Sequence, residues 1–65
     1  MPIYNSIKKL RAEKGITQEQ LGAAVSVSRQ TVVAIEKGNY TPSLMLAMEL
    51  AQFFKVSVEE LFRIQ

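Results

Sequence analysis

Apolar residues recur every three or four positions along most of this 65-residue chain. That spacing places them on one side of an α-helix, whereas the alternating pattern of a half-buried strand is absent. Residues that cap or end helices divide the pattern into five short segments. The first predicted helix begins at about Asn5, a good N-cap, and ends at Gly15, which suits the left-handed position after a helix.

The second predicted helix has a clear start. Thr17 is followed three residues later by Gln20, which is the arrangement of a capping box. Gly22 then stands inside the helix, where glycine costs about 1 kcal/mol relative to alanine. We therefore expect that Gly22 allows another segment to approach closely.

The third predicted helix follows almost at once. Ser28 is a strong N-cap, and the helix runs from Arg29 to Lys37 and ends at Gly38. Two helices joined by about three residues are typical of a helix-turn-helix, in which the second helix is presented outward. The pattern thus predicts a helix-turn-helix at about residues 17–37.

Two further helices complete the prediction. Ser43 caps a helix that continues to Phe54, and Ser57 with Glu60 has the spacing of a second capping box. We therefore predict one all-α domain of five helices over residues 1–65. The pattern also allows a short sheet between residues 1–3 and 62–65.

The third helix separates into two faces at 100° per residue. Val32 and Ile35 share one face, and the opposite face carries the residues Gln30, Ala34 and Lys37, with Arg29 and Val33 beside them. Glutamine bonds adenine bidentately, arginine bonds guanine, and small apolar groups pack against the thymine methyl. The exposed face therefore has the chemistry of a helix that enters a major groove.

Composition excludes several classes of function. The chain has neither cysteine nor histidine, so disulfides, zinc sites and thiol or imidazole catalysis are not available. Its six acidic residues are spread over several faces rather than gathered in a cleft. We expect no metal, no cofactor and no enzymatic activity. A core this small also favours oligomerisation as a further source of stability.

The charge is unevenly distributed. The net charge is only +2, but residues 1–38 carry six basic and three acidic side chains. We expect this basic part of the chain to face a phosphate backbone. There is no apolar run of the roughly 20 residues that a membrane span needs and no secretory signal, so we expect a cytoplasmic protein without a membrane partner.

The stretch from Thr17 to Gly38, followed by Tyr40-Thr41-Pro42-Ser43-Leu44, resembles the Xre/Cro/CI type of phage-repressor-like regulators. The segments 10–15 and 56–62 match the same family, so the resemblance covers nearly the whole chain. It implies a five-helix, lambda-repressor-like fold and a transcriptional regulator, most simply a repressor. It also implies a homodimer that binds double-stranded DNA at a near-palindromic operator, with the third helix in the major groove.

The resemblance assigns roles to individual residues. Gln18 is expected to bond a phosphate and to brace Gln30. The expected base contacts are Arg29, Gln30, Thr31, Val33 and Ala34. The expected backbone contacts are Gln18, Ser28, Lys37, Asn39 and Tyr40. Phosphate contacts fix the register on DNA, and base contacts give the sequence preference.

Two positions depart from the family pattern. Ser26 stands in the turn where the family usually has glycine, so we expect a left-handed residue at a cost of about 1 kcal/mol. Val33 is apolar where the family often has a polar residue. We interpret it as a contact to a thymine methyl, with partial burial as the alternative.

Two structural contacts are also predicted. Arg11 and Glu36 lie beside the apolar faces of their helices, which favours a buried ion pair between the first and third helices. The fourth helix is apolar over more than half of its circumference, wider than one small core requires. We place the dimer contact at the C-terminal part of the chain, with the residues Phe53, Leu61, Phe62 and Ile64.

An alternative use of the same fold is a protein-interaction module, such as an antitoxin that binds a toxin and represses its own operon. The operator, the regulated genes, the inducing signal and the sign of regulation do not follow from the sequence.

Overall fold

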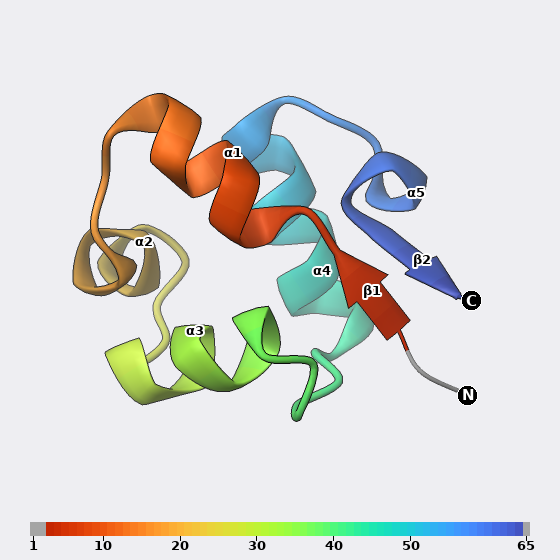
Figure 1. The fold of residues 1–65 in the computed structure, drawn as a ribbon, viewed down its shortest axis with the longest axis horizontal. Helices are drawn as coiled ribbons and strands as arrows, with labels where there is room; N and C mark the ends of the chain where they lie inside the picture. Colours follow the sequence, from red (N-terminus) through yellow and green to blue (C-terminus); the bar gives the residue numbers. More distant parts are fainter. Residues whose placement is uncertain (1–2, 65) are drawn as a thin grey trace.

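The computed structural model describes residues 3–64, which form five helices and two short strands. In chain order these are β1 (Ile3–Asn5), α1 (Ile7–Lys14), α2 (Gln18–Ala24), α3 (Arg29–Glu36), α4 (Leu44–Phe54), α5 (Val58–Leu61) and β2 (Phe62–Ile64) (Figure 1). The five helices predicted from apolar spacing are confirmed. Apart from the start of α1, their ends lie close to the predicted positions, because the capping residues are local signals.

Four helices begin at the predicted caps. Thr17 and Ser57 each form a full capping box, with Gln20 and Glu60 respectively. Single caps precede α3 and α4, where a serine side chain accepts from the backbone N–H three residues on: Ser28 and Ser43. These bonds satisfy backbone donors that have no partner inside a helix.

The expected start of α1 at Asn5 is wrong. Ser6 is the N-cap, and its side chain makes no capping bond. Asn5 pairs with Phe62 in the sheet, which keeps its backbone extended, so the helix begins later. Its side chain instead joins two elements: Oδ1 accepts from the backbone N of Ile7 at 3.2 Å, and Nδ2 donates to the carbonyl of Ile35 at 2.8 Å.

The turn between α2 and α3 has the expected left-handed residue, because Ser26 has a φ of 62°. The close approach at Gly22 is also confirmed. A Cβ at this position would lie 2.6 Å from the carbonyl oxygen of Val27, closer than any real Cβ contact. Gly22 therefore lets the turn fold back against α2, which sets the angle at which α3 is presented.

One apolar core joins all five helices. Its fully buried members lie on each of the helices: Ile7, Leu21, Val32, Ile35, Leu50 and Leu61. Leu61 has 0% of its surface exposed, so its side chain belongs to the core of its own subunit. The expectation that Leu61 contacts a second subunit is corrected on this ground.

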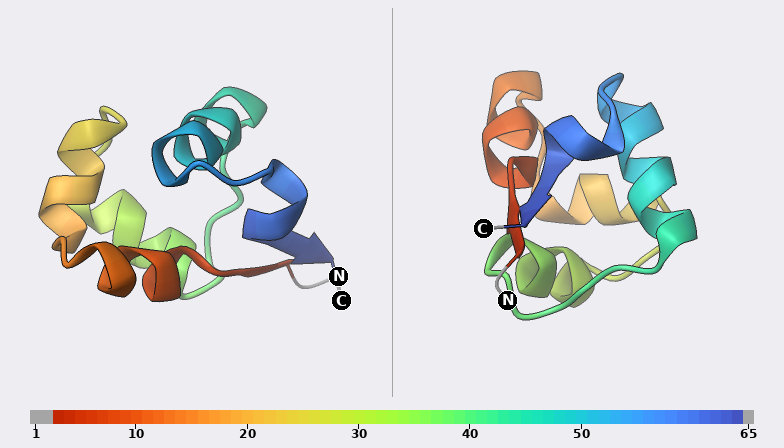
Figure 2. Two further views of the ribbon diagram at one scale, coloured as in Figure 1. Left: turned by 90° about the horizontal axis from the view of Figure 1, so that it is seen from above. Right: turned by 90° about the vertical axis from the view of Figure 1, so that its right-hand side faces the viewer.

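β1 and β2 form an antiparallel pair in which Ile3 lies opposite Ile64. The expected terminal sheet is thus present over residues 3–5 and 62–64, while Met1, Pro2 and Gln65 lie outside the described residues. Seen along two directions, the sheet and α2 lie at opposite ends of the long axis (Figures 1 and 2). The paired termini are therefore distant from α2, whereas the end of α3 lies beside β1, to which Asn5 joins it.

Candidate nucleic-acid interface

The outward face of α3 carries the residues that the sequence placed there. Arg29 and Gln30 at its start are exposed, and so is Lys37 just after its end. Val33 and Ala34 are half-buried, and they follow Gln30 by one helical turn. The helix is held from behind by Val32 and Ile35, whose side chains are buried in the core.

Thr31 differs from its neighbours on α3. Its hydroxyl lies 3.0 Å from the hydroxyl of Ser28, and its backbone N donates to Ser28 Oγ at 3.1 Å. Both hydroxyls are therefore engaged within the N-cap of α3. The structure gives these two residues a role in holding the start of the helix.

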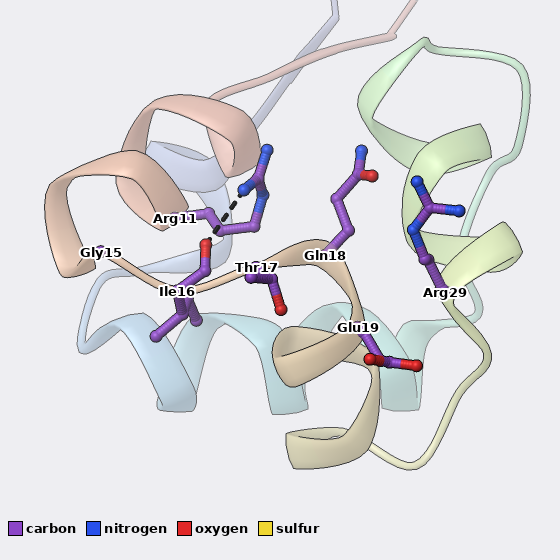
Figure 3. A pocket seen from close by; sticks show the side chains of 7 residues that line it. All are labelled: Arg11, Gly15, Ile16, Thr17, Gln18, Glu19 and Arg29. Carbon is purple, nitrogen blue, oxygen red and sulfur yellow. Dashed lines mark hydrogen bonds between the residues drawn. The ribbon is translucent and has the colours of Figure 1, made fainter.

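An open hollow of about 730 Å³ lies beside the start of α3. It is lined from the end of α1, the start of α2 and α3 by Arg11, Gly15, Ile16, Thr17, Gln18, Glu19 and Arg29 (Figure 3). Gln18 and Arg29 extend from their helices in the same direction, whereas Glu19 extends in a different one. The hollow thus brings one amide and one guanidinium to the same side of the helix-turn-helix.

The hollow is backed by an ion pair between α1 and α3. Arg11 Nε donates to Glu36 Oε2 at 2.8 Å, with the two side chains 16% and 5% exposed. Arg11 Nη1 also donates to the carbonyl of Ile16 at 3.0 Å, a bond drawn in Figure 3. The hydrogen bond with Glu36 raises the pKa of Arg11, with a smaller contribution from the carboxylate charge, against a lowering by burial.

Gln18 joins this network. Its Nε2 donates to Glu36 Oε1 at 3.1 Å, so it does not use this bond to brace Gln30 as expected. The nearby carboxylate is a stronger acceptor for an amide N–H than a neutral amide is. Glu36 therefore fixes the side chain of Gln18 at the start of α2.

The segment after α3 carries three exposed side chains, those of Lys37, Asn39 and Tyr40. Gly38 turns the chain with a φ of 80°, and the backbone N of Asn39 donates to the carbonyl of Ala34 at 2.9 Å. Asn5 also supports this end of α3 through its bond to Ile35. Sequence reasoning missed this role of Asn5 because it depends on the strand pairing.

A second surface lies where the sheet meets α4 and α5. An apolar groove of about 310 Å³ is lined by Ile3, Thr41, Pro42, Leu44, Ala47, Val58 and Phe62. Leu44, one of the residues that line this groove, is 74% exposed, and Ile64 on β2 is 70% exposed. Phe53 is not in this groove: its ring packs edge-on against Phe54 and lies under the ammonium of Lys14 at 5.3 Å.

Two absences concern the described residues only. Within residues 3–64, no group of acidic, histidine or cysteine side chains has the arrangement of a metal site. Over the same span, no helix has the length and apolar character that crossing a membrane requires.

Comparison with known proteins gives consistent results. The model of a family described as helix-turn-helix matches residues 7–61. The chain is 52% identical over 58 residues to the HTH-type transcriptional regulator YgzD of Bacillus subtilis, covering 89% of this chain and 88% of YgzD. It is 35% identical over 57 residues to the cryptic phage CTXphi transcriptional repressor RstR of Vibrio cholerae, covering 88% of this chain and 51% of RstR.

A solved structure supports the same relationship. The restriction-modification controller protein C.AhdI from Aeromonas hydrophila superimposes with a TM-score of 0.74 at 30% sequence identity. The superposition covers 83% of this chain and 78% of C.AhdI.

Proposed function

This chain belongs to the helix-turn-helix family of the Xre/Cro/CI type, a family of DNA-binding transcriptional regulators, and we propose that it is a repressor that binds a near-palindromic operator as a homodimer. In this proposal α3 enters the major groove of double-stranded DNA. In the same proposal the protein needs no cofactor, performs no catalysis and binds its operator in the cytoplasm.

The observation that carries the proposal is the outward face of α3. Arg29 and Gln30 are exposed at its start, and the helix is held from behind by buried Val32 and Ile35. A guanidinium pairs bidentately with guanine and an amide with adenine. Val33 and Ala34 complete the base-reading face, and we assign Thr31 to the cap of α3 rather than to the bases.

Backbone contacts surround this face. Gln18 is held by Glu36 through one N–H of its amide, which leaves the second N–H for a phosphate oxygen. Lys37, Asn39 and Tyr40 follow α3 as exposed donors and support a second set of phosphate contacts. We assign the Ser28 hydroxyl to the cap, so this residue contacts the DNA backbone only through its main chain.

The apolar groove supports the homodimer. We define the dimer face as the groove residues Ile3, Pro42, Leu44, Ala47, Val58 and Phe62 together with Ile64. In a two-fold dimer each subunit presents the same patch, so Ile64 of one copy reaches the groove of the other and the contact is made twice. Recognition helices about 34 Å apart then read two half-sites one turn of DNA apart.

The assignment as a repressor rests on the relative RstR, which is named a transcriptional repressor. A dimer that occupies one turn of the groove on each half-site blocks access to a promoter that overlaps it. The operator placed across the promoter of a reporter gene tests this point. Expression of the protein is expected to lower reporter output, and an increase would contradict the assignment.

The direct test of DNA recognition is selection of bound duplexes from a random pool at about 150 mM salt, which suppresses purely electrostatic binding. We expect a near-palindrome with half-sites about one helical turn apart. Recovery of no common sequence would contradict sequence-specific binding. Recovery of a single unpaired half-site would contradict the dimer.

A further inference from the structure

We propose that Asn5 is a positioning residue that fixes how far apart the two α3 helices of the dimer lie, and thereby makes the protein selective for the spacing between half-sites. This role rests on the proposed function and deepens it. Arg29 and Gln30 concern the bases that each helix reads, whereas Asn5 concerns the distance between the two reading helices. The terminal sheet thus takes part in DNA recognition without touching DNA.

The side chain of Asn5 is held at both ends. Its Oδ1 accepts from the backbone N of Ile7 at 3.2 Å, and its Nδ2 donates to the carbonyl of Ile35 at 2.8 Å. Its backbone is paired with that of Phe62 in β2. Because both ends of the amide are bonded, its orientation is defined. One residue therefore connects the sheet, the start of α1 and the last turn of α3.

The carbonyl of Ile35 is a suitable point of attachment. It belongs to the last turn of α3, where carbonyls have no partner further along the helix. It accepts from the backbone N of Gly38 at 2.9 Å, and the bond from Asn5 uses the second lone pair of the oxygen. The side chain of Ile35 is buried in the core, so the bond is made to a well-packed part of the helix.

Few other contacts connect α3 to the sheet in the part of the chain that the structure describes. α3 has many close neighbours in α2 but few in β1 or β2. A hollow of about 90 Å³ lies between them, bounded by Ile3 and Phe62 on the sheet and by Gly38 after α3. Van der Waals attraction is lost across unfilled space, so the directed bond from Asn5 sets this distance. Arg11, which also holds the end of α3, joins it to α1 and not to the sheet.

The sheet carries part of the dimer face. Ile3, Phe62 and Ile64 belong to that face, and Ile3 lies opposite Ile64 in the strand pair. In a two-fold dimer the position of α3 relative to this face is repeated in each subunit, so a displacement of α3 changes the distance between the reading helices about twice over. One base pair more or less between half-sites shifts them by about 3.4 Å and turns them by about 35°. A fixed α3 therefore discriminates between spacings.

The experiment uses the operator recovered from the random pool and two derivatives of it, with one base pair inserted or removed at the centre of the palindrome. Wild-type protein should bind both derivatives at least tenfold more weakly, because a shift of about 3.4 Å breaks the hydrogen bonds of one half-site. The ratio of the two affinities, original spacing over altered spacing, is the spacing ratio.

Asn5→Asp is the sharpest change, because it keeps the shape of the side chain and the acceptor for Ile7 but removes the N–H that donates to Ile35. Affinity for the original spacing should fall by about twofold to tenfold, the factor that corresponds to one hydrogen bond. Affinity for the altered spacings should change little, since a less firmly held α3 adapts to them. The spacing ratio should therefore fall by the same factor.

Two controls separate positioning from other effects. Asn5→Ala adds no charge and should lower the spacing ratio as well, and it serves alone if Asn5→Asp does not fold in a thermal melt. Ser6→Ala changes the neighbouring residue, whose side chain makes no capping bond, and should keep the wild-type ratio. Affinity for a duplex with a single half-site, and the dimer seen in sedimentation, should be unchanged in all three variants.

The outcomes are distinct. A spacing ratio that falls in the Asn5 variants while single half-site affinity is kept supports the proposal. Folded variants with the wild-type ratio, an equal loss on every duplex, or wild-type protein that binds all spacings alike would overturn it and leave base reading by α3 intact. Failure to recover any common duplex, or recovery of a single half-site, overturns the proposed function, and the role of Asn5 with it.

Discussion

Arg11 of α1 and Glu36 of α3 meet at 2.8 Å between Nε and Oε2, and the same carboxylate accepts from Gln18 at the start of α2. One side chain therefore connects all three helices that surround the candidate DNA-binding face. Because both partners are largely shielded from water, loss of either leaves the other poorly solvated. The ion pair fixes the end of α3 relative to α1, and the bond from Gln18 fixes it relative to the start of α2.

Loss of one partner of this pair is expected to destabilise the fold. Arg11→Met should lower the free energy of unfolding by about 3 kcal/mol, because it leaves Glu36 without its counter-charge. Arg11→Met with Glu36→Leu should cost less than the two single changes added together. Urea denaturation measures both quantities, with the exposed Lys9→Met as the control. Additive losses would contradict a direct pair.

The close approach at Gly22 makes a second prediction. Gly22→Ala should destabilise by about 2 kcal/mol or more, although alanine favours a helix, because its Cβ would lie 2.6 Å from the Val27 carbonyl. Gly15→Ala is the matched control: nothing lies within 4 Å of the added atom, and only its φ of 69° is strained. It should cost about 1 kcal/mol. Similar losses for both would show that the contact with Val27 does not matter.

The capping box of α5 gives a pH dependence. The backbone N–H of Ser57 donates to Glu60 and lowers its pKa below the ordinary 4.5, and the Ser57 side chain lowers it further. A lowered pKa in the folded state stabilises the fold above about pH 4.5, and this contribution is lost as pH falls through the folded value. Glu60→Gln keeps an acceptor but does not titrate.

The measurement is the urea midpoint between about pH 5 and pH 3. The wild-type midpoint should fall more steeply than that of Glu60→Gln. Glu59→Gln removes a carboxylate one residue away, outside the capping box, and should keep the wild-type slope. Equal slopes for wild type and Glu60→Gln would contradict the role of the cap.

The sequence predicted the parts of this structure that depend on neighbouring residues. The caps at Thr17 and Ser57 and the left-handed Ser26 follow from residues within three or four positions. The errors concern long-range pairing. Asn5 is extended because it pairs with Phe62, 57 residues away, whereas the sheet expected from the sequence ended at residue 3 on this side.

In the candidate DNA-binding site, too, some features follow from neighbouring residues and others depend on long-range packing. The outward face of α3 follows from its helical period, and the charges of Arg11 and Glu36 beside apolar stripes suggested the ion pair that the structure contains. The hydrogen-bond partner of Gln18 could not be predicted from the sequence. Whether its amide bonds Glu36 or Gln30 depends on how α2 packs against α3. Burial of Leu61 in its own subunit likewise depends on where α5 docks.

The homodimer is tested at Ile64. Ile64→Asp should shift the protein from dimer to monomer in sedimentation at about 10 μM and weaken operator binding at least tenfold, because it places a charge in the partner's apolar groove. The side chain is 70% exposed in the subunit, so folding should survive. Met45→Asp is the control for an equally exposed apolar residue outside the dimer face. Wild-type protein that sediments as a monomer would contradict the dimer.

Base reading by α3 is measured by the affinity of Gln30→Ala for the selected operator and for every single-base variant of it. We expect a loss of about 1–3 kcal/mol on the operator and a relaxed base preference at one symmetric pair of positions. Lys37→Ala should instead weaken binding to all sequences alike. It should also reduce by about one the number of counterions released on binding, which is measured from the salt dependence of the affinity. If Gln30→Ala retained the full base preference at every position, α3 would not be the reading helix.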